Sequence, residues 1–382
     1  MFKKTLSLLS LMLLFSYAFS QNADIALTFK FSHGPYIQDV SKSGASIVFT
    51  TSQPSFSWVE LTDNNGNTQA FYNIEHGVKM ANNTFHTIRI DNLSPAKDYS
   101  YQLFSKEITK FDPYSVVYGD SITSESFSFS TLNPTAEELT FIEMSDIHGN
   151  NDKLEKLLHH ADVQSADMVI YAGDMMDYYA TEDQPFHNFI DKSVEVFASE
   201  TPFWLVRGNH ETRGRYSRNL FRYVPREDGR YYYTVKQGPV LFIFFDSGED
   251  KPDDHPVYAG LNDFDNYREE QAAWLRQVVA SDEYKDAPYR IVVTHIPPLA
   301  DGWHSEQHIT KTWLPILNEA GIDLMLAGHL HEYKYFPKDA DIYAFPLIIG
   351  SNNTAARVVV NGEGIKLKTI DVNGNVIDEM KL

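Results

Sequence analysis

The sequence predicts two folded parts, an N-terminal all-β sandwich and a C-terminal α/β domain. Short alternating runs separated by turns come before residue 134, strands that alternate with helices come after it, and metal-binding residue types follow several of the later strands. A length of 382 residues fits roughly two to three domains, and a hydrophobic fraction of 43% is sufficient for globular cores.

The first twenty residues differ from the rest of the chain. Lys3 and Lys4 precede a mostly apolar run at residues 6–15, and the Ala-Phe-Ser sequence at 18–20 has the spacing of a cleavage site. The alternative is a buried helix or membrane anchor, but the run is shorter than the about 20 residues that a span needs. Residues 1–20 therefore predict a signal peptide, an exported protein (periplasmic, cell-surface or secreted) and no membrane span in the mature chain.

Residues 21–133 show the alternation of apolar and polar residues that is typical of half-buried strands. Turn signals at Asn64-Asn65-Gly66 and Ser94-Pro95 separate the runs, and no helical periodicity is convincing there. The expected strands include residues 45–49, 58–61, 84–90 and 99–103. This part is therefore expected to be an antiparallel β-sandwich.

After residue 134 the pattern becomes α/β. Residues 139–144, 151–161 and 168–171 predict a strand, a helix and a second strand, which together form a βαβ unit. Turns at 361–362 and 373–374 predict hairpins in the tail. Further strands are expected at 203–206, 240–245, 291–293 and 324–326, and further helices at 266–280 and 311–320.

Charge and cysteine content exclude several classes of function. The chain has 52 acidic and 32 basic residues, which gives a formal charge of −20. Residues 21–133 hold only 11 of the acidic and 7 of the basic residues, so most of the negative charge lies in the C-terminal part. A nucleic-acid-binding surface is therefore not expected. With no cysteine, disulfides, thiol nucleophiles, iron–sulfur clusters and cysteine-based zinc sites are excluded, and any metal must be held by His, Asp, Glu or Asn.

Five segments of the C-terminal part place such residues at or after the ends of predicted strands. In an open sheet the carboxyl ends of the strands gather at one edge, so side chains distant in sequence can converge there. A mixture of His, Asp and Asn suits zinc, iron or manganese better than copper or calcium. Each segment alone is weak, but their joint occurrence predicts a metal centre. The segments are Ser145-Asp146-Ile147-His148, Gly173-Asp174-Met175-Met176-Asp177, Gly208-Asn209-His210-Glu211, Thr294-His295-Ile296-Pro297 and Gly328-His329-Leu330-His331.

These five segments, in this order, resemble the signature of the calcineurin-like metallophosphoesterases, and the resemblance covers residues from about 139 to 350. Residues 33–38 and 93–99 resemble the fibronectin type III-like domain that precedes the catalytic domain in purple acid phosphatases. The resemblance implies a fibronectin-like sandwich at 21–133 and a four-layer α/β/β/α metallophosphoesterase domain at 134–382.

The resemblance also implies a ligand set for two metal ions, with zinc, manganese or iron as candidates. Asp174 would bridge the two ions. The ligands of the first ion would be Asp146, His148, Asp174 and His331, and those that complete the second would be Asn209, His295 and His329.

The resemblance implies roles for three neighbours of these ligands. His210 would bind no metal and would stabilise or protonate the leaving oxygen, Glu211 would orient adjacent groups, and Asp177 would accept a hydrogen bond from a ligating histidine. Purple acid phosphatases have glycine at the position of His148 and a metal-binding tyrosine at that of Asp177. A purple ferric chromophore is therefore not expected.

The expected reaction is hydrolysis of a small phosphate monoester. Two divalent ions and the carboxylates of Asp146 and Asp174 would leave a positive centre, at which a bridging water loses a proton and attacks phosphorus while His210 assists the leaving group. One alternative is phosphodiester hydrolysis at the same site. An alternative of another class is a non-catalytic surface protein whose sandwich binds a glycan or a partner.

Two further segments have more than one interpretation. Seven of the 12 arginines lie at 207–230 and either grip phosphate, with Arg213 and Arg215 as the candidates, or pair with the surrounding carboxylates. Residues 300–308, with Trp303, His304 and His308, lie between two of the metal-binding segments. Trp303 is either a stacking surface for an aromatic leaving group or an exposed loop residue.

Overall fold

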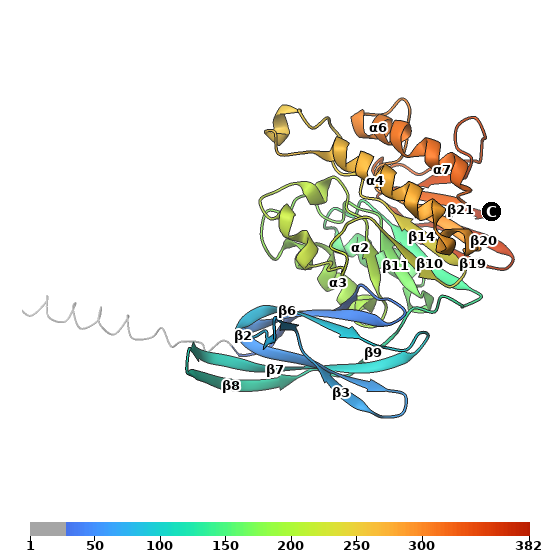
Figure 1. Cartoon of the computed structure of the whole chain (residues 1–382). Coiled ribbons are helices and arrows are strands. Elements are labelled where there is room, and N and C mark those ends of the chain that lie inside the picture. The colour runs from blue at the N-terminus through green and yellow to red at the C-terminus, as the bar shows by residue number, and fades with distance from the viewer. Residues whose placement is uncertain (1–27) are drawn as a thin grey trace, which may run out of the picture.

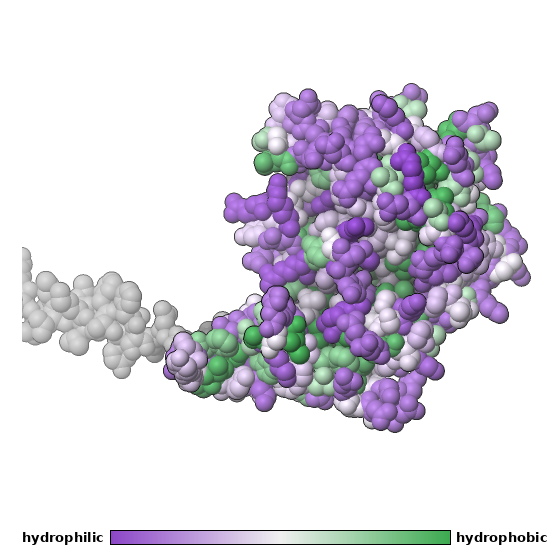
Figure 2. Space-filling view, in the orientation of Figure 1, coloured by the Kyte–Doolittle hydropathy of each residue, from purple (hydrophilic) through white to green (hydrophobic). Residues whose placement is uncertain are grey.

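The computed structural model describes residues 28–382, so the signal peptide predicted at 1–20 lies outside the described residues. Figure 1 shows an N-terminal β part below a larger α/β part. On the face in Figure 2 the α/β part is mainly hydrophilic, and hydrophobic residues are more frequent over the β part. Among the described helices, none combines the length and the apolar character needed to cross a membrane.

The N-terminal part contains only strands, paired antiparallel throughout. The 20-residue strand β2 pairs with β1 and β6 through its first half and with β3 and β7 through its second half. The strands predicted at 45–49 and 58–61 are therefore one continuous strand. The elements are β1 (Phe31–Gln38), β2 (Gly44–Asp63), β3 (Thr68–Phe71), β4 (Ile74–Glu75), β5 (Val78–Lys79), β6 (Asn83–Asp91), β7 (Asp98–Asp112), β8 (Ser115–Thr123) and β9 (Phe127–Ser130).

The C-terminal part contains two six-stranded sheets. Strands β10 to β12 are parallel, as are β14, β15, β16 and β18, which brings their carboxyl ends to one edge of each sheet. The first sheet has the order β12 (Phe203–Leu205), β11 (Met168–Tyr171), β10 (Leu139–Met144), β19 (Thr354–Asn361), β20 (Gly364–Asp371), β21 (Val376–Lys381). The second has the order β13 (Tyr233–Gln237), β14 (Val240–Phe244), β15 (Tyr289–Val293), β16 (Leu324–Ala327), β18 (Leu347–Ile349), β17 (Lys334–Phe336).

The two sheets pack face to face between two layers of helices, which confirms the predicted α/β/β/α architecture (Figure 1). Between the sheets, the rings of Phe141 and Phe242 lie edge to face with centroids 5.1 Å apart. Helix α2 (Asn151–His160) and a helical segment over 186–198, which the sequence analysis missed, cover the first sheet. The second sheet is covered by α4 (Phe264–Ala280), α5 (Asp282–Asp286), α6 (His304–Thr312) and α7 (Leu314–Ala320). Single helical turns lie at Val163–Ser165, His210–Thr212, Ser217–Arg222 and Pro256–Tyr258.

The predicted start of the helix at 311–320 is wrong. The structure has two helices, because α6 begins at His304 and α7 begins at Leu314 with Pro315 in its first turn. Proline lacks the N–H that a helix interior needs and is tolerated only in the first turn. The stretch 300–308 is therefore half loop and half helix.

The β part packs directly on the chain on both sides of β12. The buried Tyr36 hydroxyl donates to the carbonyl oxygen of Tyr223 at 2.8 Å, and the Tyr101 hydroxyl donates to that of Ser199 at 2.7 Å. Phe85 lies against the Tyr223 ring with centroids 5.2 Å apart. The β part therefore supports the segment 199–223, which contains Asn209 and His210.

A buried histidine in the β part is surrounded by hydroxyl groups. His86 Nε2 lies 3.0 Å from Thr51 Oγ1, 3.1 Å from Ser55 Oγ and 3.3 Å from Ser57 Oγ. Burial, with a smaller effect of Arg222, lowers the pKa of His86 to about 3. The native state therefore holds this imidazole neutral, whereas in the unfolded chain it titrates near its usual pKa of 6.5.

We expect His86 to make the protein less stable in acid. Between pH 6.5 and about 3 the unfolded chain binds a proton that the native state does not, so the free energy of unfolding falls by up to about 1.4 kcal/mol per pH unit as the pH decreases. Urea unfolding of wild type and His86→Gln from pH 7 to pH 4 measures this slope. The variant should lose less stability over that range, and parallel profiles would contradict the assignment.

Candidate metal centre

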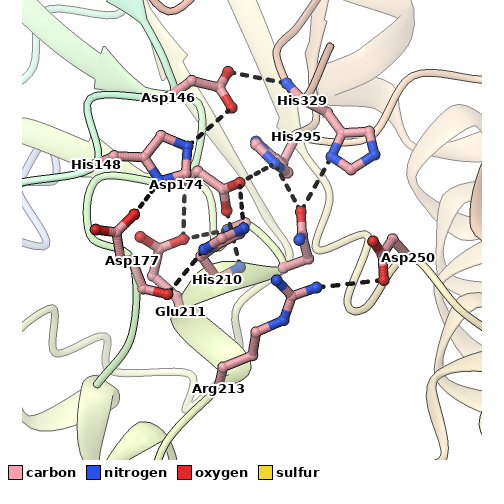
Figure 3. Close-up of polar contacts among 12 residues, drawn as sticks. Asp146, His148, Asp174, Asp177, His210, Glu211, Arg213, Asp250, His295 and His329 are labelled. Atoms are coloured by element: carbon pink, nitrogen blue, oxygen red, sulfur yellow. Dashed lines mark hydrogen bonds and ion pairs between the residues drawn. The ribbon is translucent and has the colours of Figure 1, made fainter. Parts of the chain in front are cut away.

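Backbone hydrogen bonds join the loops that follow β10 and β11. The N–H of Asp146 donates to the Gly173 carbonyl oxygen at 3.0 Å, and that of His148 donates to the Asp174 carbonyl oxygen at 3.0 Å. Figure 3 shows that the side chains of Asp146, His148 and Asp174 converge from these loops, opposite His295 and His329. The strand-end segments found in the sequence therefore meet at one place.

Five of the candidate ligands have left-handed backbone conformations that non-glycine residues rarely adopt. Such conformations persist where the surrounding structure imposes them, commonly at functional sites. The five residues are Asp146 (φ 58°), His148 (φ 53°), Asp174 (φ 54°), His329 (φ 76°) and His331 (φ 56°).

Two glycines allow the close approach of these loops. A Cβ atom at Gly173 would lie 2.5 Å from His295 Nδ1, and one at Gly208 would lie 2.2 Å from Asp174 Oδ1. Only glycine fits at these two positions.

The first group of donors is Asp146, His148 and His331. The Nε2 atoms of the two histidines are 3.1 Å apart, and His331 Nε2 lies 3.2 Å from Asp146 Oδ1, a buried atom that makes no hydrogen bond. Two imidazole nitrogens and a carboxylate oxygen that face one another leave at least one acceptor unsatisfied unless a cation lies among them. The arrangement therefore fits a metal ion.

The second group is Asp174, His295 and His329, with Asn209 beside them. His295 Nε2 lies 3.1 Å from Asp174 Oδ2 and 3.1 Å from Asn209 Oδ1, and the same Asn209 oxygen is 3.1 Å from His329 Nδ1. Asp174 also faces His210, whose Nε2 is 3.9 Å from Asp174 Oδ2. All seven predicted ligands therefore lie in one cluster.

Outer hydrogen bonds orient three of the histidines. His295 Nδ1 bonds the Ala172 carbonyl oxygen at 2.8 Å, and His148 Nδ1 bonds Asp177 Oδ1 at 2.8 Å. His210 Nδ1 bonds the carbonyl oxygen of Asp177 at 2.8 Å. Because an Nδ1–H donates in each contact, Nε2 is the nitrogen that faces the centre.

The pKa values of the buried donors reflect their close packing. Burial alone would lower the pKa of His295, but the Asp174 carboxylate raises it to about 10. Burial alone would raise the pKa of Asp174, but His295 and His210 hold it below its usual value. Burial, reinforced by His295, lowers the pKa of His329 to about 4 and keeps it neutral. A cation bound here would therefore displace a proton from His295.

Glu211 holds two of the loops together. Its fully buried carboxylate accepts hydrogen bonds from the backbone N–H groups of Asp174 (2.8 Å), Met175 (2.8 Å), Met176 (3.2 Å) and Gly208 (2.8 Å). The resemblance implied an orienting role for Glu211, and its bond to the Asp174 N–H fixes the loop that carries this ligand.

The arginine-rich segment 207–230 is mostly paired with acids. Arg207 pairs with the buried Asp246, and Arg222 pairs with Glu182. Arg213, expected as a candidate for gripping phosphate, is held by Glu249 at 2.8 Å and by Asp250 at 3.3 Å. Within residues 28–382, Arg215 forms no ion pair.

Asp250, which no sequence motif indicated, lies near His329 (Figure 3). It follows β14, whose carboxyl end reaches the same sheet edge as those of β15 and β16. Its position after a strand was the available signal, but the segment holds no histidine to draw attention to it.

Candidate metal-binding side chains that gather at the carboxyl ends of strands in two packed sheets define a metallohydrolase-like architecture. The family model of the calcineurin-like phosphoesterases matches residues 139–333. The chain belongs to this family, which confirms the resemblance seen in the sequence.

Individual relatives are consistent with this assignment. The chain is 25% identical over 251 residues to probable purple acid phosphatase 20 of Arabidopsis thaliana (63% of this chain, 56% of the relative) and 26% identical over 225 residues to purple acid phosphatase 22 of the same plant (56% and 48%). It thus spans about half the length of these curated relatives. A purple acid phosphatase from yellow lupin seeds has the same fold, with a TM-score of 0.65 and 13% identity over 91% of this chain and 73% of that one.

Replacing Glu211 is expected to disrupt both stability and metal binding. Glu211→Ala leaves four backbone N–H groups without their acceptor, at about 1–3 kcal/mol for each group that stays buried and unsatisfied. Glu211→Gln, which keeps one acceptor oxygen, should lie between Ala and wild type. Thermal unfolding and metal analysis of the purified proteins measure both effects.

The exposed Glu137→Ala serves as the matched control and should behave as wild type. Full metal content and an unchanged melting temperature in Glu211→Ala would contradict this role.

Proposed function

We propose that the protein is a metal-dependent phosphatase that hydrolyses small phosphate monoesters. The observation that carries the proposal is the convergence of Asp146, His148, Asp174, Asn209, His295, His329 and His331 around His210. We further propose that Asp146, His148, Asp174 and His331 hold one ion, and that Asn209, His295 and His329, with a shared Asp174, hold a second.

When two ions are bound, they supply charge stabilisation for the phosphoryl oxygens and lower the pKa of water. The protein holds the ligands in fixed positions through the hydrogen bonds of the buried Glu211 and through the left-handed backbone conformation of five ligand residues. His148 Nδ1 donates to Asp177 Oδ1 at 2.8 Å, and this carboxylate stands where purple acid phosphatases have their metal-binding tyrosine. We therefore propose zinc, manganese or iron without the purple chromophore.

We propose that His210 serves as the proton donor to the leaving oxygen. Its Nδ1–H is held by the Asp177 carbonyl oxygen, so Nε2 is the atom that carries the mobile proton. The ring packs edge to face on His148, with centroids 4.8 Å apart, which places His210 directly beside the first group of ligands. A general acid in this position contributes about 10²–10⁴-fold to the rate.

Monoesters are the proposed substrates because the relatives carry the names of purple acid phosphatases and of an acid phosphatase. We also propose export, from the leader at 1–20, and two domains at 21–133 and 134–382. The first would be a fibronectin type III-like domain that supports the second, as the contacts of Tyr36 and Tyr101 indicate.

His210→Ala should lower kcat by about 10²–10⁴-fold while the metal content stays at the wild-type level, because His210 donates a proton and holds no metal. Steady-state hydrolysis of 4-nitrophenyl phosphate and metal analysis measure the two quantities. The exposed His159→Ala is the matched control. Loss of metal together with turnover would make His210 a ligand instead, and unchanged turnover would remove it from the reaction.

A substrate comparison tests the reaction class. With zinc, manganese or iron bound, 4-nitrophenyl phosphate should be hydrolysed faster than bis(4-nitrophenyl) phosphate. A faster diester reaction would favour the phosphodiesterase alternative. Hydrolysis of neither ester with any of the three metals would favour a non-catalytic binding protein.

A further inference from the structure

A cavity of about 640 Å³ lies beside the loop that carries His329 and His331, because Leu330 of this loop lines it. Its walls come from the loop before α6 with the first turn of that helix, and from the segment that begins at Leu330. The apolar side chains that line it are Leu299, Trp303, Leu330, Phe336, Ile342 and Tyr343. Concave surfaces of this composition are typical of small-molecule sites.

The cavity borders two loops of the proposed catalytic site. Leu330 lies between His329 and His331, so the wall of the cavity and two of the candidate ligands share one loop. On the other side, the Ser305 N–H at the start of α6 donates to the carbonyl oxygen of Asp250 at 3.3 Å, and Asp250 lies across from His329 (Figure 3). The cavity is therefore a candidate for the space that the leaving group of a phosphate ester at the metal cluster would enter.

Two large apolar side chains at the cavity are unusually exposed for their size. Trp303 is 62% exposed and Ile342 is 54% exposed. Exposed apolar groups that gather in a hollow indicate a binding surface more often than scattered ones do. A flat apolar ligand would cover both.

The exposed Trp303 is nevertheless held in place. Its backbone N–H donates to the carboxylate of Glu306, a buried residue in the first turn of α6. The Lys251 ammonium lies 5.3 Å from the ring centroid and pairs with Asp250 at 2.8 Å. The Tyr343 hydroxyl donates to the Pro298 carbonyl oxygen at 2.7 Å and ties the two walls together. A pre-positioned ring binds a ligand at a lower entropic cost than a mobile one.

The charges on the cavity limit the class of leaving group. Asp301 and Asp339 line the rim with exposed carboxylates, and the single lysine of the lining, Lys334, lies 3.3 Å from Glu332. A leaving group with its own anionic group would be repelled by these acids. An uncharged ring would meet the apolar wall and the face of Trp303.

We propose that this cavity is the leaving-group subsite and that it selects phosphate esters of uncharged aromatic alcohols, with Trp303 as the stacking residue. The inference rests on the proposed phosphatase function. Trp303 is a specificity-determining residue here and takes no part in proton transfer.

Binding of non-hydrolysable ligands tests the subsite without any turnover. Calorimetry on the metal-loaded protein should show that 1-naphthylmethylphosphonate binds more tightly than methylphosphonate. Trp303→Ala should reduce this preference roughly 10-fold, and Trp303→Phe should keep most of it, because a ring still stacks there. The affinity for methylphosphonate should stay unchanged in both variants.

The exposed Val376→Ala, on β21 at the sheet edge, is the matched control. Trp303 contributes only its backbone to the start of α6, so these substitutions should fold, and a second variant, Ile342→Asp, should also weaken the naphthyl ligand selectively. An unchanged preference in both Trp303→Ala and Ile342→Asp would overturn the proposal.

Kinetics then separate this inference from the function on which it rests. The ratio of kcat/KM for 1-naphthyl phosphate to that for glycerol 2-phosphate should fall roughly 10-fold in Trp303→Ala. Hydrolysis of both esters with an unchanged ratio would overturn the subsite and leave the phosphatase proposal standing. Selective phosphonate binding without hydrolysis of either ester would overturn the phosphatase proposal and leave the subsite standing.

Discussion

The buried carboxylate of Glu211 is the contact on which the metal-binding cluster depends. It accepts hydrogen bonds from backbone N–H groups of the loops after β11 and β12, and the first of these loops carries Asp174. Asp174 in turn contacts His295 and accepts from the N–H of His210 at 2.9 Å. Because a buried carboxylate is stable only when its oxygens are hydrogen-bonded, one side chain fixes the relative position of two strand ends and the donors they carry.

The cluster could be predicted from the sequence because it follows a general rule of parallel sheets. His148, Asp174, Asn209 and His295 lie far apart in the chain, yet each comes just after a predicted strand, and such ends share an edge. The left-handed backbone of Asp146 and His148 could not be predicted, since both residues donate backbone hydrogen bonds to a second loop, which the sequence does not show.

Other parts of the fold were harder to predict for local reasons. Strand β2 continues through Pro54, a residue that normally signals a break, because its two halves pair with different neighbours. Helix α6 begins just after Trp303, in a segment that looks like a loop, and Glu306 in its first turn was the overlooked start signal. The arginines at 207–230 were ambiguous because both interpretations need the same residues, and only the positions of Asp246 and Glu249 decide between them.

The contact between the two parts of the chain limits which substitutions the β part can accept during evolution. Tyr36, Tyr101 and Phe85 of the β part pack on the same segment that presents Asn209 and His210. The β part is therefore not an independent module that could be removed, or exchanged for another β domain, without loss of stability in the rest of the chain. A substitution on this surface of the β part must be matched by one on the segment that it contacts. A substitution at Tyr36 or Phe85 can therefore alter the position of Asn209 and His210, although neither residue touches the metal-binding cluster.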